Sequence, residues 1–282
     1  MDYKYTNHSN REGFTLLQMA LVVIIIGLIT GGILVGQNLI ESAAISATIS
    51  QMSKYNSAAN TFQTRYGSLP GDILYSSATQ VGLAATTSGG AGLGDDNGLI
   101  QDPNGNNTPV GEILLFWRQL SDAGLIDQTL GSDLTVSTAQ APATITLAKD
   151  FPAAKFGANY IIVGSNNGYD YFGITGLQSA AGGAAGTAAY GTKNTSFTPT
   201  DAYNIDQKID DGFPISGFIQ ARGTGSGDIL AALVATNAPS WTAGASLSAC
   251  VIGGSGYATA TSYNIGGSGA NIINCTLRLQ FN

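Results

Sequence analysis

The chain has 282 residues, enough for one sizeable domain with an appendage or for two small domains. Only 10% of the residues are charged, and the formal net charge is −7. This balance argues against a nucleic-acid-binding protein, because such proteins need Lys and Arg to neutralise phosphates. The low charge, together with many Gly, Thr, Asn and Tyr residues, is common in exported β-rich proteins.

The N-terminus joins a polar leader, Met1–Gly13, to an apolar run without formal charge, Phe14–Gly36. As a helix this run would be about 35 Å long, enough to cross a lipid bilayer. An ordinary signal peptide places its small-residue cleavage site after the apolar run, whereas here Gly13 precedes the run. On these features alone, an ordinary membrane anchor remains a possible interpretation of the apolar run.

The segment "REGFTLLQMALVVIIIGLI" resembles the N-terminus of type IV prepilins and type II secretion pseudopilins. The resemblance implies that a prepilin peptidase cuts after Gly13 on the cytoplasmic side and methylates Phe14, the new N-terminal residue. It also implies a pilin-like α+β fold. In that fold a long N-terminal helix packs on a head, here residues 67–282, that contains an antiparallel β-sheet and short helices.

One position departs from the family pattern. The family usually has Glu as the fifth mature residue, where it is thought to pair with the terminal amine of a neighbouring subunit, and this chain has Gln18. Gln can accept a hydrogen bond from an amine but cannot neutralise its charge. Family members without that Glu tend to be minor subunits, so the change favours a minor subunit. The alternative is that the Glu was lost by neutral drift and that the subunit docks by apolar packing alone.

Glycines in the apolar run suit close contact between helices. Gly27 with Gly31, and Gly32 with Gly36, form two small-xxx-small pairs. We therefore expect Gln18, Gly27 and Gly31 to take part in assembly.

The helical pattern continues beyond the apolar run as an amphipathic stripe with steps of three and four residues. The stripe consists of Ile45, Ile49, Met52, Tyr55 or Asn56, Ala59, Phe62 and Tyr66. Gly67 can cap the helix, and Pro70 bars its continuation. The sequence therefore predicts one helix over residues 14–66, with residues 14–36 in the membrane and an amphipathic second half under the head.

A Gly/Asp/Asn-rich loop over residues 88–109 holds candidate calcium ligands. The spacing Asp102-x-Asn104-x-Asn106 matches the first half of a calcium-binding loop. The match then fails, because Glu112 comes one residue before the place of the bidentate Glu. One hypothesis is a Ca²⁺ ion bound by Asp95, Asp102, Asn104, Asn106 and Glu112. The alternative is an ordinary loop of Asx-turns.

The head is predicted to mix short helices and strands. "VGEILLFWRQLSDAGLI" is typical of a helix that ends at Gly124 and has one apolar face. This face consists of Ile113, Phe116, Trp117 and Leu120. Two apolar runs around Asn166-Asn167-Gly168 predict a β-hairpin, and "ISGFIQARG" and "CTLRLQF" predict further strands. The Ala/Gly-rich stretch over 179–191 predicts a flexible surface loop.

A second helix is predicted in "PTDAYNIDQKIDDGFP", capped by Thr200 or Asp201 and stopped by Gly212 and Pro214. Three carboxylates crowd the end of this helix: Asp206, Asp210 and Asp211. They could hold a cation or pair with a basic residue nearby. The alternative is a purely structural role in the loop.

The two cysteines are Cys250 and Cys275. If most of the chain is exported, they can form a disulfide; two buried free thiols are the alternative. The enclosed stretch, Val251–Asn274, resembles the disulfide-bounded region of pilins, which is usually exposed in filaments and often contacts partners.

His8 is the only histidine in the chain. Cleavage after Gly13 would leave a mature protein without histidine, which excludes Ser-His-Asp triads, Cys–His pairs and His-ligated zinc. No nucleophile motif stands out either, so we predict that the protein is not an enzyme and needs no cofactor other than the calcium ion considered above. A membrane-anchored enzyme that uses Ser, Asp or Glu without histidine is the alternative.

The resemblance implies a structural subunit, of the minor kind, in a type IV pilus or a type II secretion pseudopilus. Its expected partners are prepilin peptidase, other pilin or pseudopilin subunits, an inner-membrane assembly platform and the lipid bilayer. The protein would reside in the bacterial inner membrane with its head in the periplasm, and then in a filament in the periplasm or at the cell surface. The alternative is a membrane-tethered or pilus-tip adhesin that binds through loops of the head.

Overall fold

The computed structural model describes most of the chain in two compact units, which meet between Ala44 and Ile45. The described residues are 15–86, 92–101, 111–131, 147–166, 168–179, 190–192, 197–223, 250–252, 261–267, 270, 273 and 275–281. The leader over 1–13 lies outside them. The layout is α+β, with a long N-terminal helix and a head that combines an antiparallel sheet with short helices.

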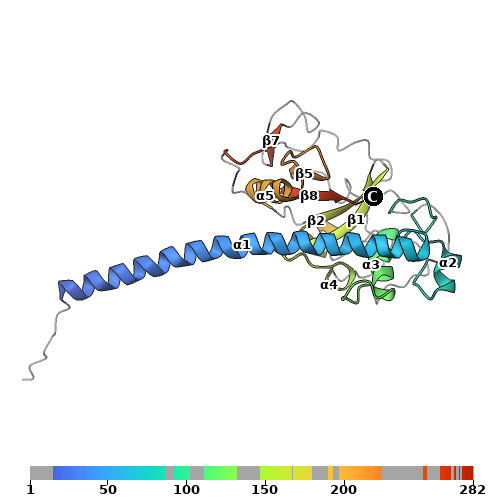
Figure 1. The fold of residues 1–282 in the computed structure, drawn as a ribbon, viewed down its shortest axis with the longest axis horizontal. Coiled ribbons are helices and arrows are strands. Elements are labelled where there is room, and N and C mark those ends of the chain that lie inside the picture. The colour runs from blue at the N-terminus through green and yellow to red at the C-terminus, as the bar shows by residue number, and fades with distance from the viewer. Residues whose placement is uncertain are drawn as a thin grey trace, which may run out of the picture. The chain divides into compact units, whose positions relative to one another are not determined.

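Helix α1 (Leu16–Tyr66) belongs to both units (Figure 1). Its residues up to Ala44 are largely exposed, whereas the predicted stripe is buried in the second unit: Ile45, Met52, Tyr55, Ala59 and Phe62. Gly67 adopts a φ of +84°, and its N–H donates to the carbonyl of Gln63 at 2.8 Å. The predicted helix and its glycine stop are confirmed, and the division between the units falls inside the helix rather than at its end.

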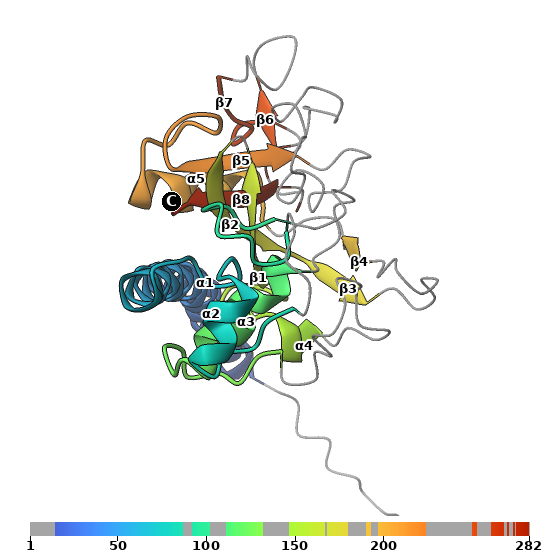
Figure 2. The same cartoon turned by 90° about the vertical axis from the view of Figure 1, so that its right-hand side faces the viewer.

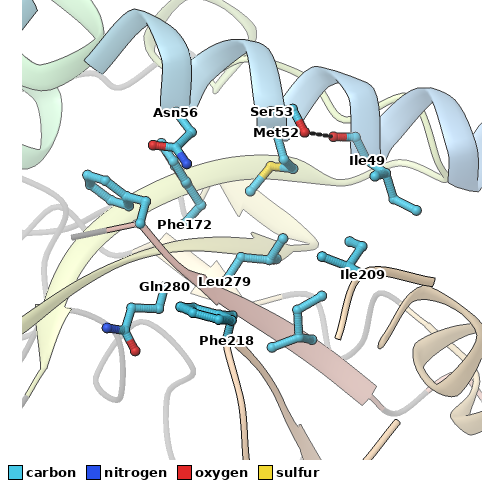
Figure 3. Close-up of a pocket in the computed structure, with 11 residues that line it drawn as sticks. Ile49, Met52, Ser53, Asn56, Phe172, Ile209, Phe218, Leu279 and Gln280 are labelled. Carbon is cyan, nitrogen blue, oxygen red and sulfur yellow. Dashed lines mark hydrogen bonds between the residues drawn. The ribbon is translucent and has the colours of Figure 1, made fainter. Parts of the chain in front are cut away.

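The head is built on a four-stranded antiparallel sheet with the order β1-β2-β8-β5. Its strands are β1 (Tyr160–Asn166), β2 (Tyr169–Thr175), β8 (Cys275–Gln280) and β5 (Ile219–Gly223). The β1–β2 hairpin and both later strands occur where the sequence predicts them. One face of the sheet, which carries Phe172 and Leu279, packs against α3 and the second part of α1 (Figure 2). Figure 3 shows these two side chains beside Met52 of α1.

Helix α3 (Glu112–Asp122) supplies the centre of the aromatic core. Trp117 lies 5.0 Å from the ring of Tyr55 on α1, and Phe116 lies 5.9 Å from the ring of Phe172 on β2. The four residues of its predicted apolar face are fully buried, and Gly124 follows with a φ of +66°. This prediction is confirmed. The short helices α2 (Tyr75–Gln80) and α4 (Leu147–Asp150) were not predicted, because so few residues carry no readable periodicity.

Helix α5 (Pro199–Ile209) begins two residues earlier than the predicted cap Thr200 allows. Thr198 is the N-cap, and it forms a capping box with Asp201, which stands three positions further on. The prediction of Thr200 or Asp201 as the cap was therefore wrong. Pro199 explains the difference, since its fixed φ favours the first position of a helix.

The loop after α5 covers the outer edge of strand β5. Asp210 Oδ2 accepts the Ile219 N–H at 2.9 Å, and the Pro214 carbonyl accepts the Ala221 N–H at 2.8 Å. Gly217 lies so close to Asp210 that a Cβ would fall 1.9 Å from Oδ2. At the opposite edge of the sheet, Ile161 and Ser165 of β1 donate to the carbonyls of Pro152 and Ile100, each at 2.9 Å. Amide groups on both edges of the sheet are thus occupied within the chain.

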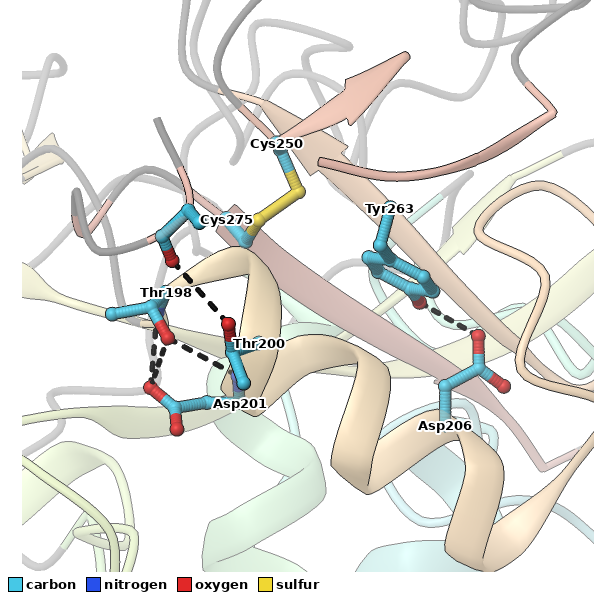
Figure 4. The surroundings of a disulfide bond; sticks show 8 residues. Thr198, Thr200, Asp201, Asp206, Cys250, Tyr263 and Cys275 are labelled. Carbon is cyan, nitrogen blue, oxygen red and sulfur yellow. Dashed lines mark hydrogen bonds between the residues drawn. A yellow bond between two sulfur atoms is a disulfide. The ribbon is translucent and has the colours of Figure 1, made fainter. Parts of the chain in front are cut away.

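A disulfide joins Cys250 to Cys275, as the sequence predicts (Figure 4). It fixes the start of β8 to the short pair β6 (Val251–Ile252) and β7 (Ser262–Tyr263). Closing a loop of this length stabilises a fold by about 3 kcal/mol on the chain-entropy account. From β7, the Tyr263 hydroxyl donates to Asp206 of α5 at 2.6 Å. Most of the region between the cysteines lies outside the described residues.

A second two-stranded sheet overlaps the ends of the predicted loop over 179–191. Strands β3 (Leu177–Ser179) and β4 (Tyr190–Thr192) are antiparallel neighbours. The ends of the predicted loop over 179–191 therefore lie in strands, and that part of the prediction was wrong. Residues 180–189 lie outside the described part.

Candidate functional site

The start of α1 is held by a reciprocal pair of hydrogen bonds between Thr15 and Gln18. The Thr15 N–H donates to Gln18 Oε1 at 2.9 Å, and the Gln18 N–H donates to Thr15 Oγ1 at 3.3 Å. This is the pattern of a capping box, which satisfies two amides that a helix start leaves free. Gln18 is therefore engaged within its own helix. The spacing Thr-x-x-Gln at a helix start indicates such a capping box, whereas the prediction for Gln18 concerned only a contact between subunits.

The first part of α1 presents an apolar surface all around the helix. Its large side chains from Leu16 to Ile40 are between 46% and 91% exposed. Thr30, the polar side chain in the middle, donates to the carbonyl of Ile26 at 2.9 Å and so needs no outside partner. Among the described residues, α1 is the one helix long and apolar enough to cross a membrane, by length and composition.

The expected assembly residues lie on this surface. A Cβ added to Gly27 or Gly31 would meet none of the described atoms within 4 Å, so both positions leave the helix backbone open to a neighbour. The expected processing residues, Gly13 and Phe14, lie outside the described part of the chain.

Three carboxylates converge in the head: Asp72, Asp95 and Glu112. One oxygen from each lies within 4.8 Å of the others, and Asp72 and Glu112 are fully buried. The structure thus brings together two of the predicted calcium ligands, Asp95 and Glu112, and adds Asp72. Asp72 was not predicted as a ligand, because it lies in the turn after α1, far from the other two along the chain. Asp102, Asn104 and Asn106 lie outside the described residues.

Backbone amides of the loop over 94–101 surround the two buried carboxylates. Glu112 accepts the N–H of Gly94 at 2.7 Å through Oε1 and the N–H of Gln101 at 2.8 Å through Oε2. Asp72 accepts the N–H of Gly98 at 2.8 Å through Oδ2. The carboxylates therefore fix the path of this loop, since each N–H would otherwise need another partner.

Asp95 completes the cluster from the loop itself. Its Oδ2 accepts from the side-chain amide of Asn97 at 3.0 Å. Its Oδ1 is buried and accepts no hydrogen bond within the part of the chain that the structure describes. Carboxylate oxygens are the ligands that Ca²⁺ prefers, so these three side chains could hold such an ion.

Burial controls the protonation of the cluster. It raises the pKa of Glu112 to about 9, against the lowering effect of the Gly94 N–H. It also raises the pKa of Asp72 to about 7, with a further rise from Asp95. At neutral pH and without a cation, the cluster therefore holds at least one proton. A divalent cation would replace that proton.

The second acidic group, Asp206, Asp210 and Asp211, has structural partners for each carboxylate. Asp206 accepts the Tyr263 hydroxyl, and Asp210 accepts the Ile219 N–H. Asp211 accepts an N–H at 2.8 Å and a hydroxyl at 2.7 Å from its own loop. Burial raises the pKa of Asp206 to about 6. These hydrogen bonds join the end of α5 and its loop to β5 and β7, so the three carboxylates have a structural role.

The free energy of unfolding of the full-length protein, in detergent with EDTA, should fall as pH rises from about 5 to about 8. The folded pKa of Glu112 lies above that of an unfolded glutamate, so the folded state binds the extra proton. Its stabilising effect is complete below about pH 4 and is lost toward about pH 9, at up to about 1.4 kcal/mol per pH unit.

Denaturant unfolding followed by the fluorescence of buried Trp117 measures this slope. Glu112→Gln should flatten it. Asp96→Asn, which changes an exposed carboxylate of the same loop, should leave it unchanged. An equal slope in the wild type and Glu112→Gln would contradict the raised pKa.

Calcium should raise the unfolding midpoint at about pH 8 and have less effect at about pH 5, where the ion must displace protons. Mg²⁺ should have less effect than Ca²⁺, because it gives up its water shell reluctantly. Glu112→Gln should abolish the calcium effect, and Asp96→Asn should retain it. If Ca²⁺ changes the unfolding midpoint at neither pH, the calcium hypothesis is wrong. Protons rather than a cation then neutralise the buried carboxylates.

Comparisons of the chain with protein-family models, with curated proteins and with solved structures find no match.

Proposed function

We propose that the protein is a minor structural subunit of a type IV pilus or a type II secretion pseudopilus, assembled through its N-terminal helix. One observation carries the proposal. A single helix, α1, has an apolar, exposed stretch without charge over residues 16–40, and beyond Ala44 a stripe of side chains that is buried in the head. A pilin-like subunit needs this combination, because its helix must enter lipid at one end and carry a water-exposed domain at the other.

The energetic argument concerns the exposed side chains between Leu16 and Ile40. Removing one Leu, Ile or Val side chain from water is worth roughly 1.5–3 kcal/mol. Over the segment this amounts to tens of kcal/mol, so the helix must be covered. Lipid covers it in a bilayer, and helices of other subunits cover it in a filament.

The polar groups of the segment fit both environments. In lipid every backbone N–H needs a partner from the protein itself. The capping box between Thr15 and Gln18 supplies partners at the helix start, and Thr30 bonds within the helix. Neither arrangement needs a charged side chain, so residues 15–40 can pass from lipid into a bundle of helices without burying an ionised side chain.

The remaining parts of the proposal concern processing and location. The polar leader before Phe14 suits removal by a prepilin peptidase on the cytoplasmic side. The disulfide suits an oxidising compartment, which a periplasmic head would occupy before its transfer into a filament. Other pilin or pseudopilin subunits and an inner-membrane assembly platform are the proposed partners.

The N-terminus of the protein from bacterial cells with active prepilin peptidase should be methylated Phe14. Gly13→Val should block cleavage, because the branched side chain replaces the glycine at the cut. Asn10→Ala, also in the leader, should be processed normally. Mass spectrometry of the N-terminal peptide separates these forms. An intact Met1 in the wild type, in such cells, would refute the proposed processing.

Gln18→Leu should lower the fraction of processed protein found in sheared filaments by about fivefold, since it removes the acceptor of the Thr15 N–H. Gln18→Glu keeps an acceptor at the same place and should retain most of the wild-type fraction. Gln37→Leu changes an exposed glutamine of the same helix outside the capping box and serves as the control. Immunoblots of sheared and cell-bound fractions measure the distribution. Equal fractions for Gln18→Leu and the wild type would show that the capping box has no part in assembly.

A further inference from the structure

The loop over 94–101 contains the pair Asn97-Gly98, which is chemically labile. An asparagine before a glycine is prone to deamidation, because no side chain hinders the attack of the glycine nitrogen on the asparagine Cγ. The attack closes a succinimide ring and releases ammonia, which takes up the proton of the glycine N–H. Water then opens the ring at either carbonyl and leaves aspartate or isoaspartate in place of asparagine. The loop therefore carries a candidate modification site.

The fold of the loop depends on both residues of this pair. Gly98 adopts a φ of +82°, a conformation that strains residues with a Cβ. The Asn97 side chain bonds at both ends of its amide. Its Oδ1 accepts the Leu99 N–H at 2.8 Å, and its Nδ2 donates to Asp95 Oδ2 at 3.0 Å. Nδ2 also donates to Gln101 Oε1 at 3.2 Å. An ionised aspartate has no donor for the last two bonds, so the loop needs the labile asparagine.

In the folded loop, Asp72 holds the nitrogen that would attack. The Gly98 N–H donates to Asp72 Oδ2 at 2.8 Å, and the Asn97 N–H donates to Oδ1 of the same carboxyl group at 3.3 Å. Asp72 is fully buried. The ring nitrogen of a succinimide carries no hydrogen, so closing the ring removes the bond between Gly98 and Asp72 and leaves a buried oxygen without this donor.

The group that would leave is held by acceptors. Nδ2 of Asn97 must gain a proton to depart as ammonia, and its partners, Asp95 Oδ2 and Gln101 Oε1, accept hydrogen bonds from it. Its departure removes both of these bonds as well. The Leu99 N–H, by contrast, polarises the carbonyl that is attacked and would assist the reaction. In total the reaction loses the hydrogen bonds of both nitrogens and gains this one polarising contact.

We propose that Asn97 is a modification site that the folded loop keeps unreacted, so that its deamidation marks chains in which the loop over 94–101 has opened. Local opening frees both nitrogens, and the pair then reacts as it would in a flexible peptide. Asp72 protects the site most strongly, because it holds the attacking nitrogen. The protection does not depend on the proposed function of the protein.

The reaction also prevents the loop from closing again. It replaces the Nδ2 donor of Asn97 by a carboxylate oxygen, which would then face the Asp95 carboxylate. Two carboxylates at such a distance repel each other. In isoaspartate the main chain also runs through the former side chain and is longer by a CH₂ group, which shifts the Gly98 N–H away from Asp72. The modification is therefore a one-way record of opening.

Peptide mass spectrometry of the full-length protein, in detergent with EDTA at mildly alkaline pH, tests the proposal. Two further pairs, Asn104-Gly105 and Asn167-Gly168, serve as references in the same digest. In enough urea to unfold the head, all three asparagines should react at similar rates, because each precedes a glycine. In the folded protein, Asn97 should react at least about tenfold more slowly than in urea, since the reaction waits for opening. Equal rates of Asn97 in the two conditions would overturn the proposal.

Three variants test the protecting contacts. Asp72→Asn keeps the size of the side chain but leaves one oxygen for two N–H donors, and should raise the rate at Asn97 in the folded protein by about fivefold. Gln101→Leu removes an acceptor of Nδ2 and should raise the rate by less. Asp96→Asn changes an exposed carboxylate of the same loop and should leave the rate close to that of the wild type.

The fluorescence of buried Trp117 shows which of these variants are folded, and fragment spectra identify the converted asparagine. If Asp72→Asn does not fold, Gln101→Leu decides the question. Folded variants that deamidate at Asn97 no faster than Asp96→Asn would show that these contacts do not protect the site.

Asn97→Asp introduces the product carboxylate directly and tests the one-way step. Its unfolding midpoint in EDTA should lie below that of the wild type, because the new carboxylate faces Asp95. Asn60→Asp adds the same charge at an exposed position of α1 and should lower the midpoint less. Equal midpoints for Asn97→Asp and the wild type would overturn the one-way record.

Discussion

The structure depends on one helix that must suit two environments. Up to Ala44, α1 exposes apolar side chains on all sides, and from Ile45 onward it buries a single stripe against the head. The same backbone hydrogen bonds serve both parts, so the difference lies entirely in the side chains. The change from an all-round apolar surface to a stripe marks where the surroundings of the helix change, and it divides the chain into its two compact units.

The head is held together in a complementary way. Much of it is irregular backbone, whose N–H groups need acceptors once they are buried. Carboxylates supply these acceptors: Glu112 and Asp72 hold the loop over 94–101, and Asp210 holds the loop before β5. The acidic composition therefore has a structural explanation in addition to any role in binding cations. Burial of such acids makes protons, or a cation in their place, part of the folded state.

Sequence periodicity was sufficient for the long elements. Apolar residues recur over several helical turns in the stripe of α1 and in the face around Trp117, so both helices were predicted. The hairpin at Gly168 was predicted from two apolar runs on either side of a turn sequence. The contacts that define the candidate site were harder to predict. Asp72 joins Glu112 only through the folding of the loop between them, and nothing near Asp72 indicates a partner. The hydrogen bonds between Gln18 and Thr15 could have been predicted from the spacing Thr-x-x-Gln, but the prediction for Gln18 concerned only a contact with a neighbouring subunit.

The covered edges of the sheet have a consequence for how copies of this chain can join. Ile219 and Ala221 on one side, and Ile161 and Ser165 on the other, already donate to acceptors of their own chain. A strand from another molecule finds these amides occupied and cannot extend the ladder. At these positions of the four-stranded sheet, growth by a donated strand, the route to amyloid-like stacking, would first have to displace hydrogen bonds within the chain.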